Sequence, residues 1–112
     1  MHKLIALYEK PADEAQFRSH LEKVHLPLVA KFPGLRAMRH GFDVVNPDTS
    51  SYFAVVECEF DSAEDMHAAL ASPESQAAAD DVPNYASAGV TILTYAVAEE
   101  VDCERQFGKA TR

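Results

Sequence analysis

Residues 17–29 read Phe-Arg-Ser-His-Leu-Glu-Lys-Val-His-Leu-Pro-Leu-Val, and this stretch predicts an amphipathic helix. Apolar side chains recur there at the three- and four-residue spacing of one helical face, at Phe17, Leu21, Val24 and Leu28. At about 100° per residue, His25 falls about 60° from the centre of that face, and His20 falls about 80° away on the other side. Pro27 removes a backbone donor and disturbs the helix next to His25. The stretch therefore predicts a histidine at the edge of a pocket.

The flanking sequence predicts the order strand, helix, strand, strand, helix, strand. Strands are expected at 3–8, 35–45, 51–60 and 87–98, and the first helix at 14–31, with Asp13 as its N-cap. The second helix opens at 61–65 with Ser62 as its cap, restarts at Ser72 and Pro73, and continues to Asp81. With right-handed crossovers, this order predicts an α+β, ferredoxin-like βαββαβ sandwich with a four-stranded antiparallel sheet and two helices on one face. Residues 1–98 form the expected domain, and 99–112 form a polar C-terminal tail.

The predicted sheet is apolar on both faces although helices cover only one. The first strand is apolar on both sides, and the last strand alternates Val90, Ile92 and Ala96 with Leu93, Tyr95 and Val97. An apolar face needs a cover. A second copy of the sheet, packed as a two-fold homodimer, is the expected cover, and a tail folded across the sheet is the alternative.

Composition restricts the partners of this 112-residue chain. Its formal charge of −8 argues against nucleic acid and against anionic membrane surfaces. The apolar stretch near the N-terminus is too short for a signal peptide and is typical of a first strand, so a cytoplasmic location is expected. Cys58 and Cys103 are then expected to be free thiols.

The element His25-Leu26-Pro27-Leu28-Val29, followed by Phe32-Pro33-Gly34-Leu35, resembles the EthD family, which is named for its association with ethyl tert-butyl ether degradation gene clusters. The resemblance spans about 3–97. It implies membership of the dimeric α+β barrel superfamily, a homodimer, and a pocket between sheet and helices in each subunit. The wider superfamily includes cofactor-independent monooxygenases, lactone isomerases and polyketide cyclases. The family's histidine corresponds to His25.

Two histidines are candidate catalytic residues. His25 is suited to act as a general acid or base, and its alternative is a structural histidine that bonds a carbonyl freed by Pro27. His40 shares a strand face with Met38 and Phe42, and could meet His25 if that face lines the pocket. The alternative for His40 is a solvent-facing or interface position.

Four further residues are candidate substrate contacts. Tyr8 and Tyr52 could donate hydrogen bonds to a substrate oxygen, or could simply be core tyrosines. Met38 and Phe42 would supply apolar contacts. Cys58, in the middle of a strand, is expected to be a small buried hydrophobe rather than a nucleophile.

The sequence offers no support for a metal or an organic cofactor. His20 and His25 are five residues apart, a spacing that does not share a face in an α-helix, and no phosphate-binding glycine motif is present. The leading hypothesis is a small cofactor-independent catabolic enzyme that moves a proton on a hydrophobic or aromatic molecule, as an isomerase or oxygenase would. The alternative is a non-catalytic ligand-binding or accessory protein of a degradation pathway.

Overall fold

The computed structural model describes residues 1–45 and 51–103, and it contains the predicted order of elements. The strands are β1 (His2–Glu9), β2 (Leu35–Phe42), β3 (Tyr52–Phe60) and β4 (Val90–Ala96). The first helical segment comprises α1 (Glu14–His20), a π-helical turn η1 (Leu21–His25) and α2 (Leu26–Val29). The second comprises α3 (Ala63–Leu70), α4 (Pro73–Asp81) and a 3₁₀ turn η2 (Val82–Asn84).

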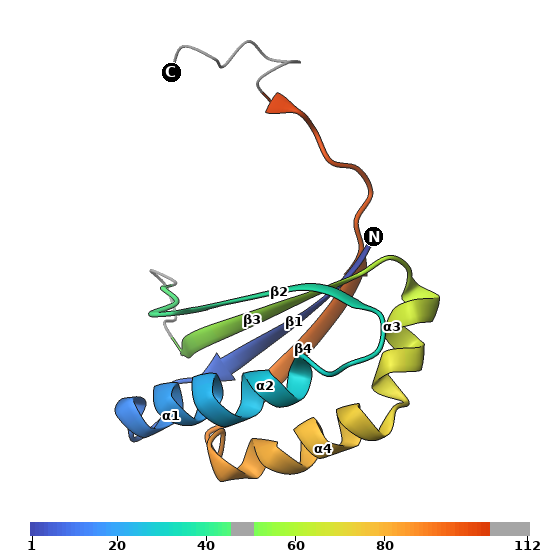
Figure 1. Ribbon diagram of the computed structural model, residues 1–112. Helices are drawn as coiled ribbons and strands as arrows, with labels where there is room; N and C mark the ends of the chain where they lie inside the picture. The colour runs from blue at the N-terminus through green and yellow to red at the C-terminus, as the bar shows by residue number, and fades with distance from the viewer. Residues whose placement is uncertain (46–50, 104–112) are drawn as a thin grey trace.

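The four strands form one antiparallel sheet in the order β2-β3-β1-β4. All helices in residues 1–45 and 51–103 lie on one side of this sheet, and no element of these ranges covers the other side (Figure 1). The predicted ferredoxin-like fold is thus confirmed. After β4 the chain leaves the sheet, and most of the expected tail, 104–112, lies outside the described residues.

Side-chain caps fix the helix starts where the sequence predicts them. Asp13 Oδ1 accepts a hydrogen bond from the Gln16 amide at 3.0 Å, and Ser62 Oγ accepts one from the Asp65 amide at 3.1 Å. Ser72 caps α4, with Pro73 at its first position. Each cap satisfies a backbone donor that the helix itself leaves unpaired, so each start is locally determined.

The π-helical turn overturns the predicted apolar face of the first helix. The Leu26 amide donates to the Leu21 carbonyl, an i→i+5 bond that places one extra residue in the turn. After Leu21, the buried positions are therefore His25, Leu26 and Val29. Val24, which the sequence assigns to the apolar face, is 42% exposed. That assignment was wrong because it assumed an unbroken α-helix.

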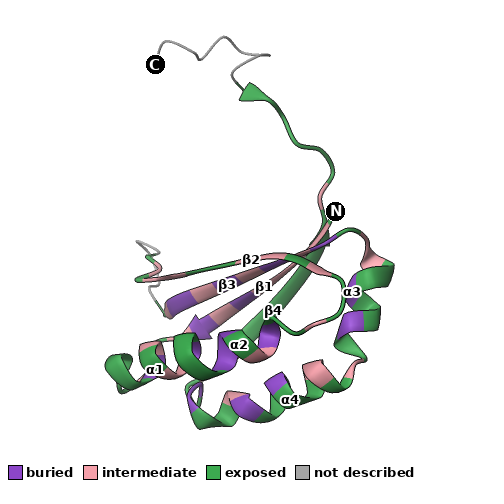
Figure 2. Ribbon diagram, viewed as in Figure 1, coloured by how far each residue is buried: buried purple, intermediate pink, exposed green. Residues whose placement is uncertain are grey.

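The core lies between the sheet and the helices (Figure 2). Phe17 from α1 is almost fully buried and makes ring contacts with Tyr8, Phe53 and Tyr85. These contacts fix the height of the first helix above the sheet, and with it the position of the π turn.

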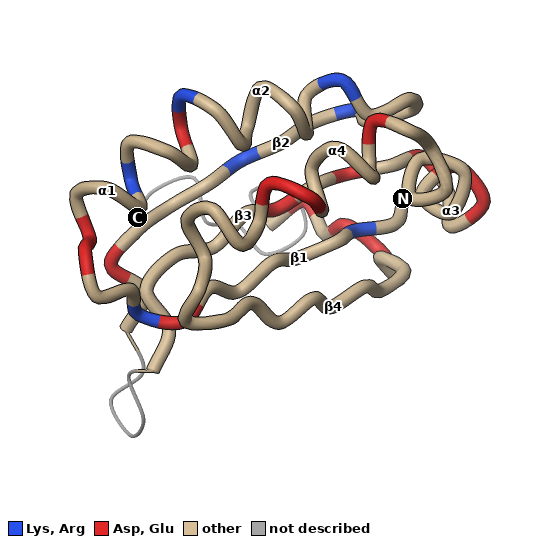
Figure 3. Tube along the Cα trace, turned by 90° about the horizontal axis from the view of Figure 1, so that it is seen from below, with Lys and Arg blue, Asp and Glu red and all other residues tan. Residues whose placement is uncertain are grey.

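The uncovered sheet face is apolar at one end and charged at the other. Leu93 pairs with Ile5, and Leu7 pairs with Val55. Towards the other end, Glu59 binds Arg39 at 2.7 Å and Lys3 at 3.5 Å. Arg39 therefore forms an ion pair across the β2–β3 hairpin, while β4 carries no charged residue (Figure 3). Across 1–45 and 51–103, no helix has the length and apolar character needed to cross a bilayer.

Candidate functional site

A cavity of about 270 Å³ lies between the sheet and the helices. Most of its wall is apolar and comes from β1, α2, β3, α4, η2 and β4, including Ala6, Val29, Val56, Ala78, Val82 and Val90. Cys58 also borders it, and burial raises the pKa of that thiol to about 11, so it stays protonated. None of the lysine, arginine, aspartate or glutamate side chains in the described ranges lines the cavity.

His25 is the basic group in the wall of this cavity. Its side chain is 6% exposed, and its Nδ1 lies 3.0 Å from Asp81 Oδ2. Because an ionised carboxylate only accepts, Nδ1 carries the proton, and the lone pair is on Nε2. Nε2 has no hydrogen-bond partner within the part of the chain that the structure describes. It is therefore the ring nitrogen available to a molecule in the cavity.

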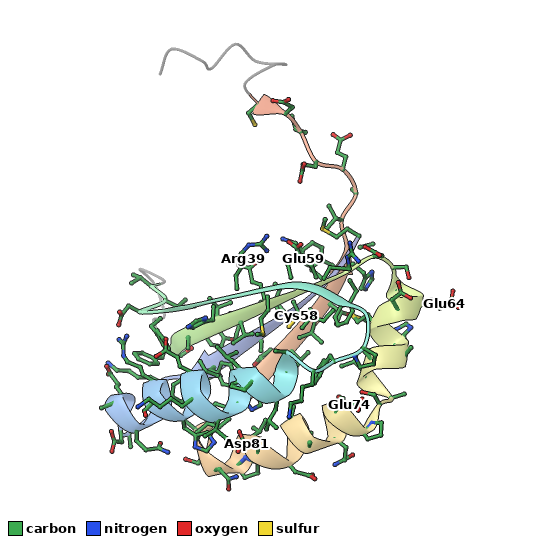
Figure 4. The ribbon with its side chains drawn as sticks, in the orientation of Figure 1. Arg39, Cys58, Glu59, Glu64, Glu74 and Asp81 are labelled. Carbon is green, nitrogen blue, oxygen red and sulfur yellow. The ribbon has the colours of Figure 1, made fainter. Side chains whose placement is uncertain are left out.

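Figure 4 shows Asp81 at the end of α4. Its carboxylate accepts hydrogen bonds from three side chains. Besides His25, it accepts from His20 Nε2 at 2.8 Å and from Asn84 Nδ2 at 3.0 Å. Desolvation alone would raise the pKa of this carboxyl. The hydrogen bonds from Asn84, His20 and His25 outweigh it, so the pKa of Asp81 is lowered. Asp81 is thus a negative charge held behind His25.

Burial acts in the opposite direction on the imidazole. Desolvation lowers the pKa of His25, and the hydrogen bond to Asp81 offsets only part of that effect. His25 is therefore neutral at neutral pH. A neutral imidazole with a fixed tautomer, facing an apolar cavity, can accept a proton.

Two tyrosines complete the polar end of the site. The Tyr8 and Tyr85 hydroxyls lie 2.8 Å apart, and Tyr8 borders the cavity. The Tyr85 ring stacks on the His20 ring with 5.1 Å between the ring centroids, and its centroid lies 4.8 Å from that of the His25 ring. Desolvation raises the pKa of both tyrosines, so both hydroxyls keep their protons. The pair can offer a hydroxyl donor near the His25 ring.

Of the six site residues expected from the sequence, His25 and Tyr8 lie at the cavity. The other four, His40, Met38, Phe42 and Tyr52, do not line it. His40 and Phe42 are on the helix-facing side of β2, but this is an edge strand. His40 Nε2 contacts Glu22 Oε2 at 3.1 Å, and Arg18 stacks over Phe42 at 4.6 Å. The structure does not bring His40 to His25.

Sequence reasoning missed Asp81, His20 and Tyr85. It placed His20 and His25 on different faces, which was wrong, because the π turn brings residues five apart to one side, where both reach Asp81. One signal was available: Asp80 and Asp81 end a helix, where negative charge is unfavourable to the helix dipole unless something compensates. Over the described ranges, no group of three or more His, Cys, Asp or Glu side chains, the His20–His25–Asp81 cluster included, is arranged to hold a metal ion.

The sequence profile of the EthD domain matches residues 9–89 of this chain. The chain belongs to the EthD family. An EthD-family protein from Bacillus halodurans is 34% identical and has a similar structure with a TM-score of 0.78, covering 90% of this chain and 99% of that one. An uncharacterized 11.0 kDa protein from the thcB-thcC intergenic region of Rhodococcus erythropolis is 38% identical over 83% of this chain and 91% of its own length.

Two more distant structures share the fold of this EthD-family chain. A dimeric ferredoxin-like protein of unknown function from Thermobifida fusca has a TM-score of 0.66 at 18% identity, covering 86% of this chain and 90% of that one. The hydroxynitrile lyase of Passiflora edulis has a TM-score of 0.70 at 16% identity, covering 89% and 95% respectively.

Proposed function

We propose that this EthD-family protein is a cofactor-independent enzyme that moves a proton on a small, uncharged organic molecule bound in the cavity. His25 Nε2 is the proton acceptor, and Asp81 stabilises the imidazolium that forms. The Tyr8 hydroxyl orients an oxygen of the substrate. The observation that carries this proposal is a buried, neutral histidine, hydrogen-bonded to a carboxylate on one side and open to an apolar cavity on the other.

The size of the cavity supports a substrate with one ring. An apolar protein cavity of about 150 Å³ is large enough to hold benzene. A cavity of about 270 Å³ therefore suits a ring with a short side chain. Because no lysine, arginine, aspartate or glutamate of the described residues lines it, a bound carboxylate or ammonium group would be desolvated without a charged partner there, at a large free-energy cost. An uncharged aromatic or alicyclic carbonyl compound, consumed in a degradation pathway, fits this wall.

The same site also supports a second candidate, a ligand-binding protein without catalysis. The favouring observation is that the cavity wall is almost wholly apolar, so that burial alone provides affinity. In that case His25 and Tyr8 would only hold the polar end of the ligand.

We also propose that the protein acts as a homodimer packed through its uncovered sheet face. Leu93 and Tyr95, at 50% and 47% exposure, are large apolar side chains on that face. The dimeric ferredoxin-like neighbour from Thermobifida fusca supports this assembly by analogy of fold.

A panel of uncharged one-ring ketones, beginning with phenylacetone, tests the catalytic proposal. Binding is followed by NMR shifts of the Val90 and Ile92 methyl groups, which line the cavity. Catalysis is followed as exchange of the hydrogens next to the carbonyl for deuterium in heavy water. Phenylacetate, of similar shape but charged, is the matched control ligand. We expect phenylacetone to bind and exchange, and phenylacetate to do neither.

His25→Gln separates the two candidate functions. It should retain ketone binding and lose about 10²–10⁴-fold in exchange rate, which is the usual contribution of a general base. His67→Gln, at an exposed position on α3, is the control variant and should keep the wild-type rate. Undiminished exchange in His25→Gln would refute the role of His25. Ketone binding by the wild type without any exchange would favour the ligand-binding protein.

A further inference from the structure

Two histidines bind one carboxylate, that of Asp81. His25 faces the cavity with 6% of its side chain exposed, whereas His20 keeps 20% of its side chain exposed. The side chain of Asp81 is 8% exposed, contacts His20 Nε2 through both oxygens and contacts His25 Nδ1 through Oδ2. The Nδ1 atom of His20 has no hydrogen-bond partner in the described ranges. His25 therefore faces the cavity, and His20 is the more solvent-accessible histidine of the cluster.

The two rings are linked through Asp81 and not by direct hydrogen bonding. Tyr85 stacks on His20 with an interplanar angle of 16° and tilts against His25 at 49°. Each imidazole directs one N–H at the carboxylate. A single positive charge on either ring balances the charge of Asp81. A second one would leave a net positive charge in a largely buried cluster, which is unfavourable.

We propose that His20 is a positioning residue that exchanges charge with His25 through Asp81. The step starts from a His20 ring that carries a proton on both nitrogens. As His25 Nε2 takes a proton from the bound molecule, His20 releases its Nδ1 proton to solvent water, and the net charge of the cluster stays constant. No proton crosses the carboxylate, because both N–H donors to Asp81 remain in place. The role in turnover rests on the proposed function, but the charge coupling itself is a property of the ligand-free protein.

The other titratable groups that face this cluster keep one protonation state across the pH range in which histidines usually titrate. They are Tyr8 from β1, Cys58 from β3 and Tyr85 after η2. Desolvation raises the pKa of all three, to about 11 for Cys58, so they remain protonated. Asp81 stays ionised because its pKa is lowered. A change in the charge of this cluster therefore comes from its two imidazole rings, His20 and His25.

The test follows the ring nitrogens of ¹⁵N-histidine-labelled protein by NMR against pH, without ligand. In the wild type, His25 should titrate over a broadened range, with an inflection at the pH where His20 changes charge, as coupled sites do. His20→Gln keeps an amide donor for Asp81 but cannot titrate. In this variant the inflection should vanish and the midpoint of His25 should move to higher pH, because a competing positive charge has been removed.

His67→Gln is the matched control, and its His25 curve should coincide with that of the wild type. A simple one-site His25 curve in the wild type would overturn the proposal without any variant. So would an unchanged His25 midpoint in a folded His20→Gln protein. If the coupling is found but His25→Gln still exchanges ketone hydrogens at the wild-type rate, the proposed function fails while the coupling stands.

Discussion

At the scale of single residues, the site depends on two opposite pKa shifts within one hydrogen bond. Burial lowers the pKa of His25, and the donors around Asp81 lower the pKa of its carboxyl. The pair is therefore a neutral base beside a fixed negative charge, and not an ion pair at neutral pH. His25 Nε2 is thus free to accept a proton, and the negative charge of Asp81 stabilises the imidazolium that then forms.

These shifts predict how stability depends on pH. The folded protein binds a proton at His25 less readily than the unfolded chain, so stability falls as pH drops below the ordinary value of 6.5. Asp81 contributes stability that is present above its ordinary value of 3.8 and lost as pH falls through the lowered one. Urea unfolding should therefore give a smaller free energy at about pH 5 than at about pH 7.5. His25→Gln should lose much of that difference, and equal pH dependence in both proteins would contradict the shift at His25.

The residues at the site were only partly predictable from the sequence. His25 and Tyr8 could be selected because a histidine two residues before a proline and a tyrosine at the end of a strand are local features. Asp81 is 56 positions from His25, and only the packing of α4 against α2 brings them together. An aspartate after an alanine run is typical of a solvated helix end. The hydrogen bond of Asp81 to His25 therefore depends on tertiary packing and could not be predicted from the local sequence.

At the scale of elements, the π turn decides which side chains of the first helix face inward. Caps and turns are local, and Asp13, Ser62 and Ser72 act where the sequence places them. The π turn is not signalled in this way, because an α-helical repeat fits the same apolar residues almost as well. The sequence therefore predicted the helix correctly and its buried face incorrectly.

Substitutions on the two sides of the π turn check this assignment. Leu21→Ala should lower the free energy of unfolding by about 2–5 kcal/mol, because it opens a space in the core. Val24→Gln should change it by no more than about 0.5 kcal/mol, because that side chain is on the surface. Urea unfolding of both variants measures the contrast. A large loss of unfolding free energy in Val24→Gln would contradict this assignment and support the unbroken α-helix that the sequence predicts.

For the whole molecule, the order of strand-like and helix-like segments in the sequence was enough to predict the topology of the sheet. That topology in turn explains why one face of the sheet is uncovered. Four strands with both crossovers on one side leave the other side bare. Alternation then determines what that side presents, which is an apolar end around Leu93 and a charged end around Glu59. The apolar end of the face favours burial against a partner, and the charged end favours contact with water.

Leu93→Glu should convert the proposed dimer to single subunits, since it places an unpaired charge in the middle of the buried apolar end. Sedimentation velocity on the wild type and the variant measures this. Val24→Gln, on the helical side of the molecule, is the control and should sediment as the wild type does. A wild type that sediments as a single subunit across micromolar concentrations would exclude the dimer.

The π turn also means that the first helix carries one residue more than its packing requires. Glu22, Lys23 and Val24 are all exposed, whereas Leu21 and His25 on either side are buried. Removing any one of these three would close the turn into an ordinary α-helix and bring the two imidazoles to four-residue spacing, still on one side. A shortened chain should thus keep both its core and its paired rings. A deletion one turn earlier or later would swing half of the helix away from the sheet.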